Sequence, residues 1–445
     1  MALTGLDIFK LLPKTNCKKC GVPTCLAFAM QLAQKRAKLE DCPYVSDEAK
    51  AKLAAAAAPP MRKVAFGSGD ARVQVGQETV MFRHEEKFHN PTVVAVSVSD
   101  KLSGQQLNER IERINALQFE RVGTRIGVKA AVVINESGRA DDFVRVCEAV
   151  SKGSSLALIL VTQSLEAMRA AATKLAPAKP LLAAATRGTA EAMAKIARDA
   201  GCPLAAKGES VEELAEVSEK IKAGGVEDIV LWLDAPSLRE QLYGLSRMRA
   251  LALKRLFRPI GYPVIAFGGG GTADRQSAAA IALACKYAGI VVVDTIEPWA
   301  ILPVLTAVMN IYSDPQKPVQ VEPKVYAIGE PGVDSPLMFT TNFSLTYYTV
   351  ESDVEASRVS SYILVVDTEG TSVLTAYSGD KLNEKSVAEA MAKHSVDKLV
   401  RHRKIIIPGY VAVLSGKIEE ATGWEVLVGP RECSMLPKYL RETWV

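Results

Sequence analysis

The sequence lacks the features that would place it in several special classes of protein. It has no apolar run of the roughly 18 residues that a membrane-spanning helix needs, and its beginning, MALTGLDIFKLLPK, has no charged segment followed by a long apolar core. The formal net charge is only +4 over 445 residues, with acids and bases interleaved, so neither a membrane surface nor a nucleic acid is indicated as a partner. These absences predict a soluble, cytoplasmic protein.

Cysteine is also scarce, and eight cysteines in a chain of this length do not form a disulfide scaffold in a reducing compartment. Four of them nevertheless form one pattern, C-x2-C-x4-C-x16-C, made by Cys17, Cys20, Cys25 and Cys42. Four soft thiolates suit an iron–sulfur cluster or zinc. The spacing lacks the second C-x2-C pair of many structural zinc sites, which favours a 4Fe–4S cluster over zinc.

The remaining cysteines are scattered singly along the chain. Cys147, Cys202 and Cys285 lie in segments expected to be helices or strands, where a cysteine behaves as a small buried apolar residue. Cys433 differs, because VGPRECSMLP reads as a loop after a strand.

The chain is expected to divide into four segments. Residues 1–58 form the cluster domain, which ends in a linker at residues 51–63 where a poly-alanine run meets Pro59 and Pro60. Residues 59–91 hold the rest of that linker and small hairpins, formed from VAFG, ARVQVG and ETVMFRHE.

Residues 92–323 repeat a strand-then-helix pattern eight times. Strands that are apolar throughout and joined by helices indicate a parallel sheet, and eight units match a (β/α)8 TIM barrel, with an open doubly wound sheet as the alternative. The eight candidate strands are TVVAVSV, AAVVIN, LALILV, LLAAAT, PLAAK, DIVLWLD, VIAFG and IVVVDT.

Residues 324–445 again alternate strands and helices, which predicts an open, flavodoxin-like α/β domain. The expected strands are KVYAIG, LTYYTV, YILVVD, KIIIPGY and EVLVGP. A ligand of such a domain is expected where loops leave the carboxyl ends of the strands.

The three parts together carry a resemblance to a known family. The cysteine module, the barrel, and a last domain with DTEGTSVLTAYSGDKL and IPGYVAVLSGKIEEATGWEVLVGPRE resemble the large (gamma) subunit of the corrinoid iron–sulfur protein of the acetyl-CoA (Wood–Ljungdahl) pathway. The cysteine module alone occurs in other redox proteins. The order of the parts and the C-terminal motifs are more specific, and they cover essentially the whole chain.

This resemblance implies a methyl-group carrier in anaerobic carbon dioxide fixation. A cobamide on the C-terminal domain would accept a methyl group as Co(I) from methyltetrahydrofolate held by a separate methyltransferase, and donate it from Co(III)–CH3 to acetyl-CoA synthase/CO dehydrogenase. The cluster on the four cysteines would return oxidised Co(II) to Co(I). The implied partners also include a small subunit in a heterodimer and an activator for reductive repair.

The resemblance also directs attention to loops of the C-terminal domain as the cobamide site. After the strand YILVVD, the loop up to Thr375 offers a glycine for close backbone approach and several hydroxyls, although an ordinary strand-to-helix loop with capping residues would look similar. With the resemblance, a cobamide site is favoured. The predicted contacts are Thr340, Thr346, Gly370, Thr371, Ser372, Val373, Leu374, Gly409, Gly416 and Cys433.

None of the four histidines lies in the D-x-H-x-x-G context of many cobalamin domains. His84, His89, His394 and His402 are therefore expected to be surface or hydrogen-bonded residues. A cobamide here should be bound with its base detached and no histidine on cobalt, which makes Co(II) easier to reduce.

The barrel carries one glycine-rich motif, FGGGGTADR, in which the amides of Gly268 to Gly271 could cradle a phosphate or simply form a tight turn. Asp234, Asp294 and Glu297 follow predicted strands, where a barrel places catalytic groups. Because the resemblance implies a docking scaffold, no catalytic residue is assigned. The alternative functions are an iron–sulfur electron-transfer protein with a C-terminal flavin, and a pterin-binding methyltransferase that uses the barrel.

Overall fold

The computed structural model describes residues 5–33, 36–46, 49–50, 53 and 59–444. Most of the linker predicted at residues 51–63 lies outside the described residues. The chain forms two compact units, of which one comprises Met1–Phe119 with Ile126–Tyr312 and the other Glu120–Arg125 with Ser313–Val445. No helix in the described ranges is long and apolar enough to span a membrane.

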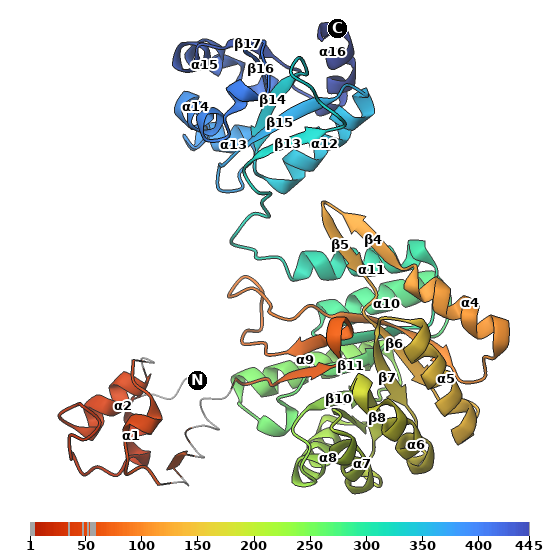
Figure 1. Ribbon diagram of the computed structural model, residues 1–445. Helices are drawn as coiled ribbons and strands as arrows, with labels where there is room; N and C mark the ends of the chain where they lie inside the picture. The colour runs from red at the N-terminus through yellow and green to blue at the C-terminus, as the bar shows by residue number, and fades with distance from the viewer. Residues whose placement is uncertain (1–4, 34–35, 47–48, 51–52, 54–58, 445) are drawn as a thin grey trace. The chain divides into compact units, whose positions relative to one another are not determined.

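The cysteine segment, whose helices α1 and α2 are labelled in Figure 1, has a small apolar cluster of its own. It contains helices α1 (Gly5–Leu11) and α2 (Cys25–Ala33) and a 3-10 turn, η1 (Leu39–Asp41). Phe28 and Ala29 of α2 are fully buried, and they pack with Ile8 of α1 and with Val45 beyond η1.

The following hairpin pairs β1 (Lys63–Phe66) with β2 (Val73–Gly76) in antiparallel register. Val64, Phe66 and Val75 are buried in the same cluster as the side chains inside the barrel, so the hairpin covers one end of the barrel interior. This confirms the hairpin predicted from VAFG and ARVQVG. The third predicted strand, ETVMFRHE, is wrong, since residues 78–85 form turns and bends.

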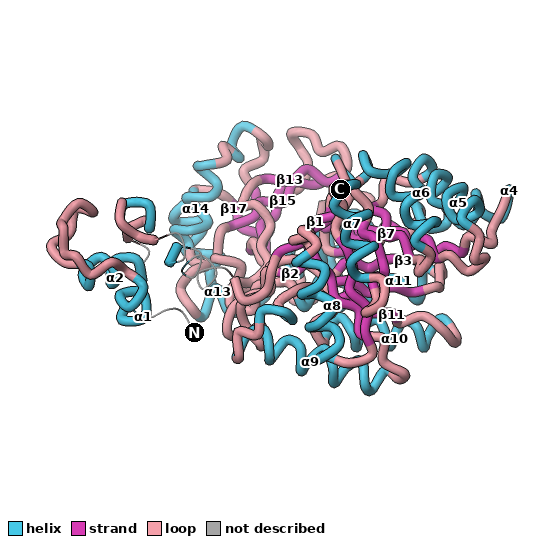
Figure 2. The backbone as a smooth tube through the Cα atoms, turned by 90° about the horizontal axis from the view of Figure 1, so that it is seen from below, coloured by secondary structure: helices cyan, strands magenta, loops and turns pink. Residues whose placement is uncertain are grey.

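Eight parallel strands close into a barrel in the order β10-β11-β12-β3-β6-β7-β8-β9. This closed order confirms the predicted (β/α)8 barrel and excludes the alternative, an open doubly wound sheet. Figure 2 shows these strands surrounded by helices. The strands are β3 (Val93–Ser99), β6 (Ala130–Ile134), β7 (Ala157–Val161), β8 (Leu181–Ala185), β9 (Leu204–Gly208), β10 (Ile229–Leu233), β11 (Val264–Phe267) and β12 (Ile290–Val293).

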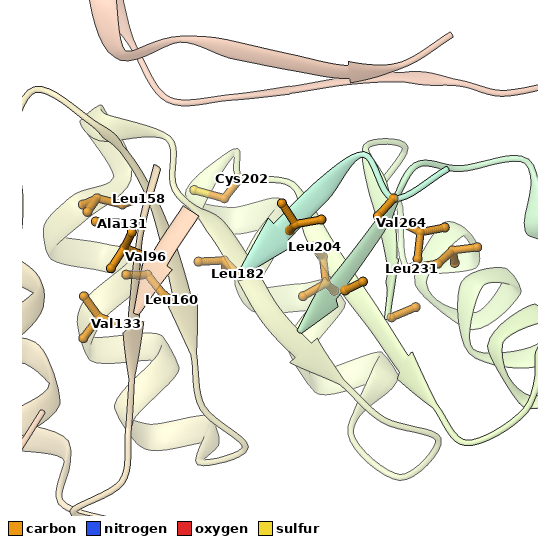
Figure 3. Packing of buried hydrophobic residues seen from close by; sticks show 14 of the residues in the cluster. Val96, Ala131, Val133, Leu158, Leu160, Leu182, Cys202, Leu204, Leu231 and Val264 are labelled. Carbon is orange, nitrogen blue, oxygen red and sulfur yellow. The ribbon is translucent and has the colours of Figure 1, made fainter. Parts of the chain in front are cut away.

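The barrel strands are mostly apolar because both of their faces are buried. In β3, Val94, Val96 and Val98 pack outward against helices, whereas Val93 and Ala95 point into the barrel interior. Figure 3 shows the outward-facing layer. The covering helices are α4 (Gly104–Asn115), α5 (Ala140–Gly153), α6 (Leu165–Leu175), α7 (Ala190–Ala200), α8 (Val211–Ala223), α9 (Leu238–Lys254), α10 (Ala273–Cys285) and α11 (Pro298–Ile311). A short hairpin, β4 (Gln118–Arg121) with β5 (Thr124–Gly127), separates α4 from β6.

A buried ion pair anchors the segment after β2 to the barrel helices. Arg249 of α9 lies 3.6 Å from a carboxylate oxygen of Glu78, and both side chains are almost fully buried. The guanidinium also lies between the rings of Phe88 and Tyr287, at 5.3 and 4.8 Å from their centroids. Burial raises the pKa of Glu78, and the charge of Arg249 only partly offsets this effect.

We expect the stability that Glu78 contributes to fall as the pH rises. A carboxyl group whose pKa is raised by folding binds its proton more tightly in the native state, so its contribution is fully present below its ordinary pKa of 4.5. That contribution is lost as the pH rises through the folded-state pKa. The difference in unfolding free energy between the wild type and Glu78→Gln, measured by urea unfolding from about pH 4 to pH 7, should therefore decrease. A difference in unfolding free energy that stays constant or increases with pH would contradict a raised pKa of Glu78 in the folded protein.

The C-terminal unit is built on an open five-stranded sheet in the order β13-β15-β14-β16-β17, in which β13 is antiparallel to its neighbour. Its strands are β13 (Val325–Ile328), β14 (Leu337–Thr341), β15 (Ser361–Val366), β16 (Lys404–Ile407) and β17 (Glu425–Val428). Its helices are α12 (Ser344–Ser357), α13 (Val373–Ser378), α14 (Glu384–Lys393), α15 (Ser415–Thr422) and α16 (Leu436–Thr443). This confirms the predicted open α/β architecture.

One predicted strand of this unit is wrong. LTYYTV lies within helix α12, and the actual strand is β14, which contains LMFTT. The β-branched and aromatic residues of LTYYTV favour a strand in isolation. In the structure, however, Tyr347, Val350 and Val354 bury one face of helix α12 against the sheet. Tertiary packing therefore overrides the local preference.

Candidate cofactor sites

The loop before α2 wraps closely around one cysteine. The backbone N–H of Asn16 donates to the sulfur of Cys25 (3.4 Å), and the N–H of Cys25 donates to the side-chain oxygen of Asn16 (2.8 Å). Lys14, Asn16 and Lys18 all have left-handed backbone conformations, with φ of 58°, 50° and 62°. Cys25 is the first residue of α2, so this loop leads directly into the helix.

The other three thiols belong to the same small module. Cys42 follows η1 and is buried in one apolar cluster with Cys25, while Cys20 is partly buried against that cluster. A hydrogen bond from the backbone N–H of Lys19 lowers the pKa of the more exposed Cys17. Two buried thiols and two accessible ones, beside an apolar wall, form a donor set that fits a thiolate-ligated iron–sulfur cluster.

The four sulfur atoms do not lie close enough together in the structure to form a ligand set. Among the described residues, no group of three or more cysteine, histidine or acidic side chains is placed so that it could hold a metal ion. Ligation by Cys17, Cys20, Cys25 and Cys42 therefore stays a prediction from spacing and donor chemistry.

The C-terminal unit has a cavity of about 480 Å³ at the carboxyl ends of β14 and β16. The connection after β14 leads to β15 on one side, and the chain then crosses back to β16 on the other side, so the strand order reverses here. The two strands share the single register pair Met338–Ile406. Beyond that pair Thr340 and Ile407 line the cavity, at the position where open α/β sheets bind ligands.

Helix α12 provides one wall of this cavity. Thr346, Thr349, Val350 and Asp353 recur at intervals of three or four residues, so they share one helical face, and all four line the cavity. The rest of the lining includes the start of α13, residues 429–434 and Leu436 of α16, and Leu436 packs in one cluster with Val350 of α12. The lining is mostly apolar with a few hydroxyl and carboxylate groups, which is typical of a site for an organic ligand.

One buried hydroxyl in the cavity wall has no partner. Thr340 is 1% exposed, and its Oγ1 makes no hydrogen bond to any described group. A buried hydroxyl without a partner is costly, so it marks a place where a ligand group can bind. The apolar lining together with this orphan hydroxyl fits a large organic cofactor that carries polar substituents.

Six of the ten predicted cobamide contacts line this cavity and four do not. The six are Thr340, Thr346, Ser372, Val373, Leu374 and Cys433. Burial raises the pKa of the Cys433 thiol, with smaller contributions from Asp353 and Glu432, so the thiol stays neutral near pH 7.

The other four predicted residues have different positions. Gly409 packs against the cavity-lining loop, where a side chain would lie 2.5 Å from the carbonyl oxygen of Gly429. Gly370 has a φ of +73° and, with Thr371, belongs to the turn before α13. Gly416 lies near the start of α15 with open space around it.

Sequence reasoning missed Asn342, which organises the turn at residues 367–371. Its Oδ1 accepts hydrogen bonds from the backbone N–H groups of Thr368 (3.0 Å) and Gly370 (2.9 Å), and its Nδ2 donates to Asp367 (2.9 Å). Asn342 is buried directly after β14. A lone polar residue at the end of an apolar strand was the available signal, but the false strand at LTYYTV obscured it.

The four histidines lie away from this cavity, since none is among its described lining residues. His402 bonds the carbonyl oxygen of Ser335 (2.9 Å), and His89 lies 3.5 Å from Glu86. His84 stacks on Phe82, and His394 ends α14. A cofactor bound without a histidine ligand therefore stays a prediction.

The polar groups at the carboxyl end of the barrel are bonded to one another. Asp294 accepts hydrogen bonds from the hydroxyl of Ser97 (2.7 Å) and from the N–H of Gly270 (3.0 Å). A side chain at Gly269 would meet the Asp294 carboxylate at 2.4 Å. The glycine run at Gly268–Gly271 is thus a tight turn over Asp294, which favours the turn interpretation over a phosphate cradle.

The remaining candidates at the barrel mouth are also paired. Glu297 pairs with Arg113 (2.8 Å) and Asp234 pairs with Lys207 (2.8 Å). Lys207 lies over the ring of Trp232, which stacks on Phe267 with ring centroids 4.3 Å apart. These contacts engage each of the candidate acidic residues with a neighbouring group.

Two family models match this chain, and together they cover most of its length. Residues 63–440 match the family model described as CO dehydrogenase/acetyl-CoA synthase delta subunit, and residues 12–44 match a model described as a putative Fe-S cluster. The corrinoid/iron-sulfur protein large subunit of Moorella thermoacetica is 44% identical, with 99% of each chain covered. The acetyl-CoA decarbonylase/synthase complex subunit gamma of Methanothermobacter thermautotrophicus is 37% identical, again over 99% of each chain.

Among solved structures, the chain resembles dihydropteroate synthases over about half of its length. The enzyme from Vibrio fischeri matches with a TM-score of 0.39 and 14% identity, covering 51% of this chain and 95% of that chain. The enzyme from Thermus thermophilus matches with a TM-score of 0.38 and 18% identity, covering 50% and 94%.

Proposed function

This chain belongs to the family of corrinoid/iron–sulfur protein large subunits and acetyl-CoA decarbonylase/synthase gamma subunits, and we propose that it is the cobamide-bearing methyl carrier of such a complex. The observation that carries the proposal is the apolar cavity at the β14–β16 edge, with its unpartnered Thr340 hydroxyl, in a chain that also has a four-thiol module.

When bound, a cobamide would supply methyl-transfer chemistry at its cobalt, and a 4Fe–4S cluster would supply the single electrons that keep the cobalt reduced. In this proposal Cys17, Cys20, Cys25 and Cys42 hold the cluster. The methyl donor is methyltetrahydrofolate on a separate methyltransferase, and the acceptor is acetyl-CoA synthase. A small subunit completes a heterodimer, and an activator protein assists reductive repair.

The cavity residues bind and orient in this scheme, and they move no proton. Val350, Ile406 and Leu436 offer an apolar bed, and the Thr340 hydroxyl can donate or accept one hydrogen bond. The cavity volume suits a detached lower base better than a whole corrin ring. The corrin ring would instead contact the exposed side chains of Leu374 and Tyr410, which lie at the cavity. In this proposal the chain holds the cofactor by apolar contact and by the Thr340 hydroxyl, and no histidine of this chain ligates the cobalt.

The two alternative functions have less support from the described residues. The pterin-binding alternative needs free polar groups at the barrel mouth, and Asp234, Asp294 and Glu297 are all engaged with neighbouring groups. A flavin would bind in the same C-terminal cavity as the cobamide, so the two cofactors have to be distinguished by experiment.

Metal analysis and spectroscopy of the anaerobically purified protein, alone and with its small subunit, test the proposal. We expect about four iron atoms and about one cobalt atom per chain, and corrin bands that shift on reduction and on methylation. The Co(II) EPR spectrum should lack hyperfine splitting from a coordinated base nitrogen. A yellow flavin spectrum with fluorescence after denaturation, or methyltetrahydrofolate binding to the chain alone, would overturn it.

A further inference from the structure

The cysteine module has a charge distribution unlike that of the rest of the chain. The whole sequence is nearly balanced, with 54 basic and 50 acidic residues. Residues 8–39, however, contain seven basic residues and no acidic residue, and this stretch includes three of the four predicted cluster ligands. The seven are Lys10, Lys14, Lys18, Lys19, Lys35, Arg36 and Lys38.

Three of these lysines belong to the loop that carries Cys17 and Cys20. Lys14, Lys18 and Lys19 are exposed, and the left-handed conformations of Lys14 and Lys18 coil this loop tightly. Within the described part of the chain, neither Lys14 nor Lys18 forms an ion pair. By contrast, Lys10 pairs with Asp7 at 3.1 Å. Residues 14–20 form what we call the cluster loop.

These exposed lysines contribute little to holding a cluster in place. Two charges 4 Å apart in water interact by about 1 kcal/mol, and salt reduces this further. Unpaired like charges on one short loop also repel each other. Their larger effect is on an approaching molecule, because a one-sign surface can raise association rates by about 10- to 1,000-fold.

Apolar side chains follow the cluster loop directly. Leu26 comes immediately after Cys25, and Met30 lies one helical turn further along α2, so both share one face of the helix. Both side chains are exposed. A charged rim beside a small apolar centre is the usual composition of a transient protein–protein interface.

We propose that the cluster loop, with Leu26 and Met30, is the docking surface for an acidic one-electron carrier protein. This inference rests on the proposed function, because it requires a cluster on the four thiols. The carrier loses one electron and the cluster gains one, so no proton or other reactant is needed. Carboxylates on the carrier would face Lys14 and Lys18, since the ammonium group of Lys19 already donates to the Tyr44 hydroxyl and lies over the Tyr44 ring. Short-lived contact suits repeated single-electron delivery.

The test uses the full-length, cluster-loaded protein and an acidic bacterial ferredoxin as the probe. We compare the wild type with the Lys14→Gln/Lys18→Gln double variant, measuring the ferredoxin affinity in the oxidised state and the rate of cluster reduction by stopped-flow absorbance. At low ionic strength, the variant should bind ferredoxin about tenfold more weakly, and its cluster should be reduced about tenfold more slowly. The wild-type rate should fall as salt is added.

The matched control is Lys152→Gln/Lys286→Gln, which removes the same charge from two exposed lysines of the barrel unit and should behave as the wild type. Reduction by photoreduced deazaflavin, a small uncharged donor, and the midpoint potential of the cluster should be unchanged in both variants. Equal ferredoxin rates in the two variants, or rates independent of salt, would overturn the docking proposal. A protein without iron would overturn the proposed function itself, and iron analysis shows this before ferredoxin is added.

Discussion

Replacing Cys42 with serine is expected to eliminate the iron–sulfur cluster. Cys42 is the only predicted ligand beyond α2, since the other three lie within nine residues of one another. A serine hydroxyl is a harder donor that stays protonated near neutral pH, so it is a poor substitute for a thiolate. Serine would also place a hydroxyl in the apolar cluster that Cys42 shares with Cys25. Both effects act in the same direction.

Iron analysis and visible absorbance check this result. Cys42→Ser should fall from about four iron atoms per chain to a small residue, and the broad iron–sulfur absorbance should disappear. Cobamide content should be retained, because the cavity lies in the other compact unit. The matched control is Cys285→Ser, at an exposed position on α10, which should retain its iron. Full iron in Cys42→Ser would show that Cys42 is not a ligand.

Thr340→Val is expected to have opposite effects on the free and the cofactor-bound protein. Without cofactor, the buried Thr340 hydroxyl has no partner, and valine has nearly the same shape without the polar atom. Removing an unsatisfied buried hydroxyl should raise the free energy of unfolding by about 1 kcal/mol. If the hydroxyl bonds the cobamide, the same change should weaken cobamide binding about tenfold.

Thr341→Val is an unusually close control for that experiment. Thr341 is fully buried and its Oγ1 also has no partner among the described residues, but it is not part of the cavity lining. Adjacent strand residues point to opposite faces of the sheet. Thr341→Val should therefore stabilise the cofactor-free protein by a similar amount and leave cobamide affinity unchanged. Urea unfolding and equilibrium dialysis measure the two quantities, and equal affinities in the two variants would remove Thr340 from the site.

The barrel could be predicted from the sequence because its strands are buried on both faces. All eight predicted strands are present, and each is a mostly apolar run followed by a segment of helical length. The error at LTYYTV has the opposite origin. Helix α12 packs a face of aromatic and β-branched residues on the sheet, and composition alone does not reveal a helix of that kind. That error hid Thr349, Val350 and Asp353 as cavity residues.

By itself the sequence determined the chemistry of the donors, because four thiols at fixed spacing and the absence of a histidine motif depend only on residue identity. It also determined the barrel, whose strand-and-helix alternation is local. Only the tertiary structure decided where the C-terminal ligand cavity lies, because that depends on β14 and β16 becoming neighbours and separating beyond Met338 and Ile406. Likewise, only packing shows that Thr340 is buried without a partner and that Asp294 is already engaged, since both facts depend on residues far away in the chain.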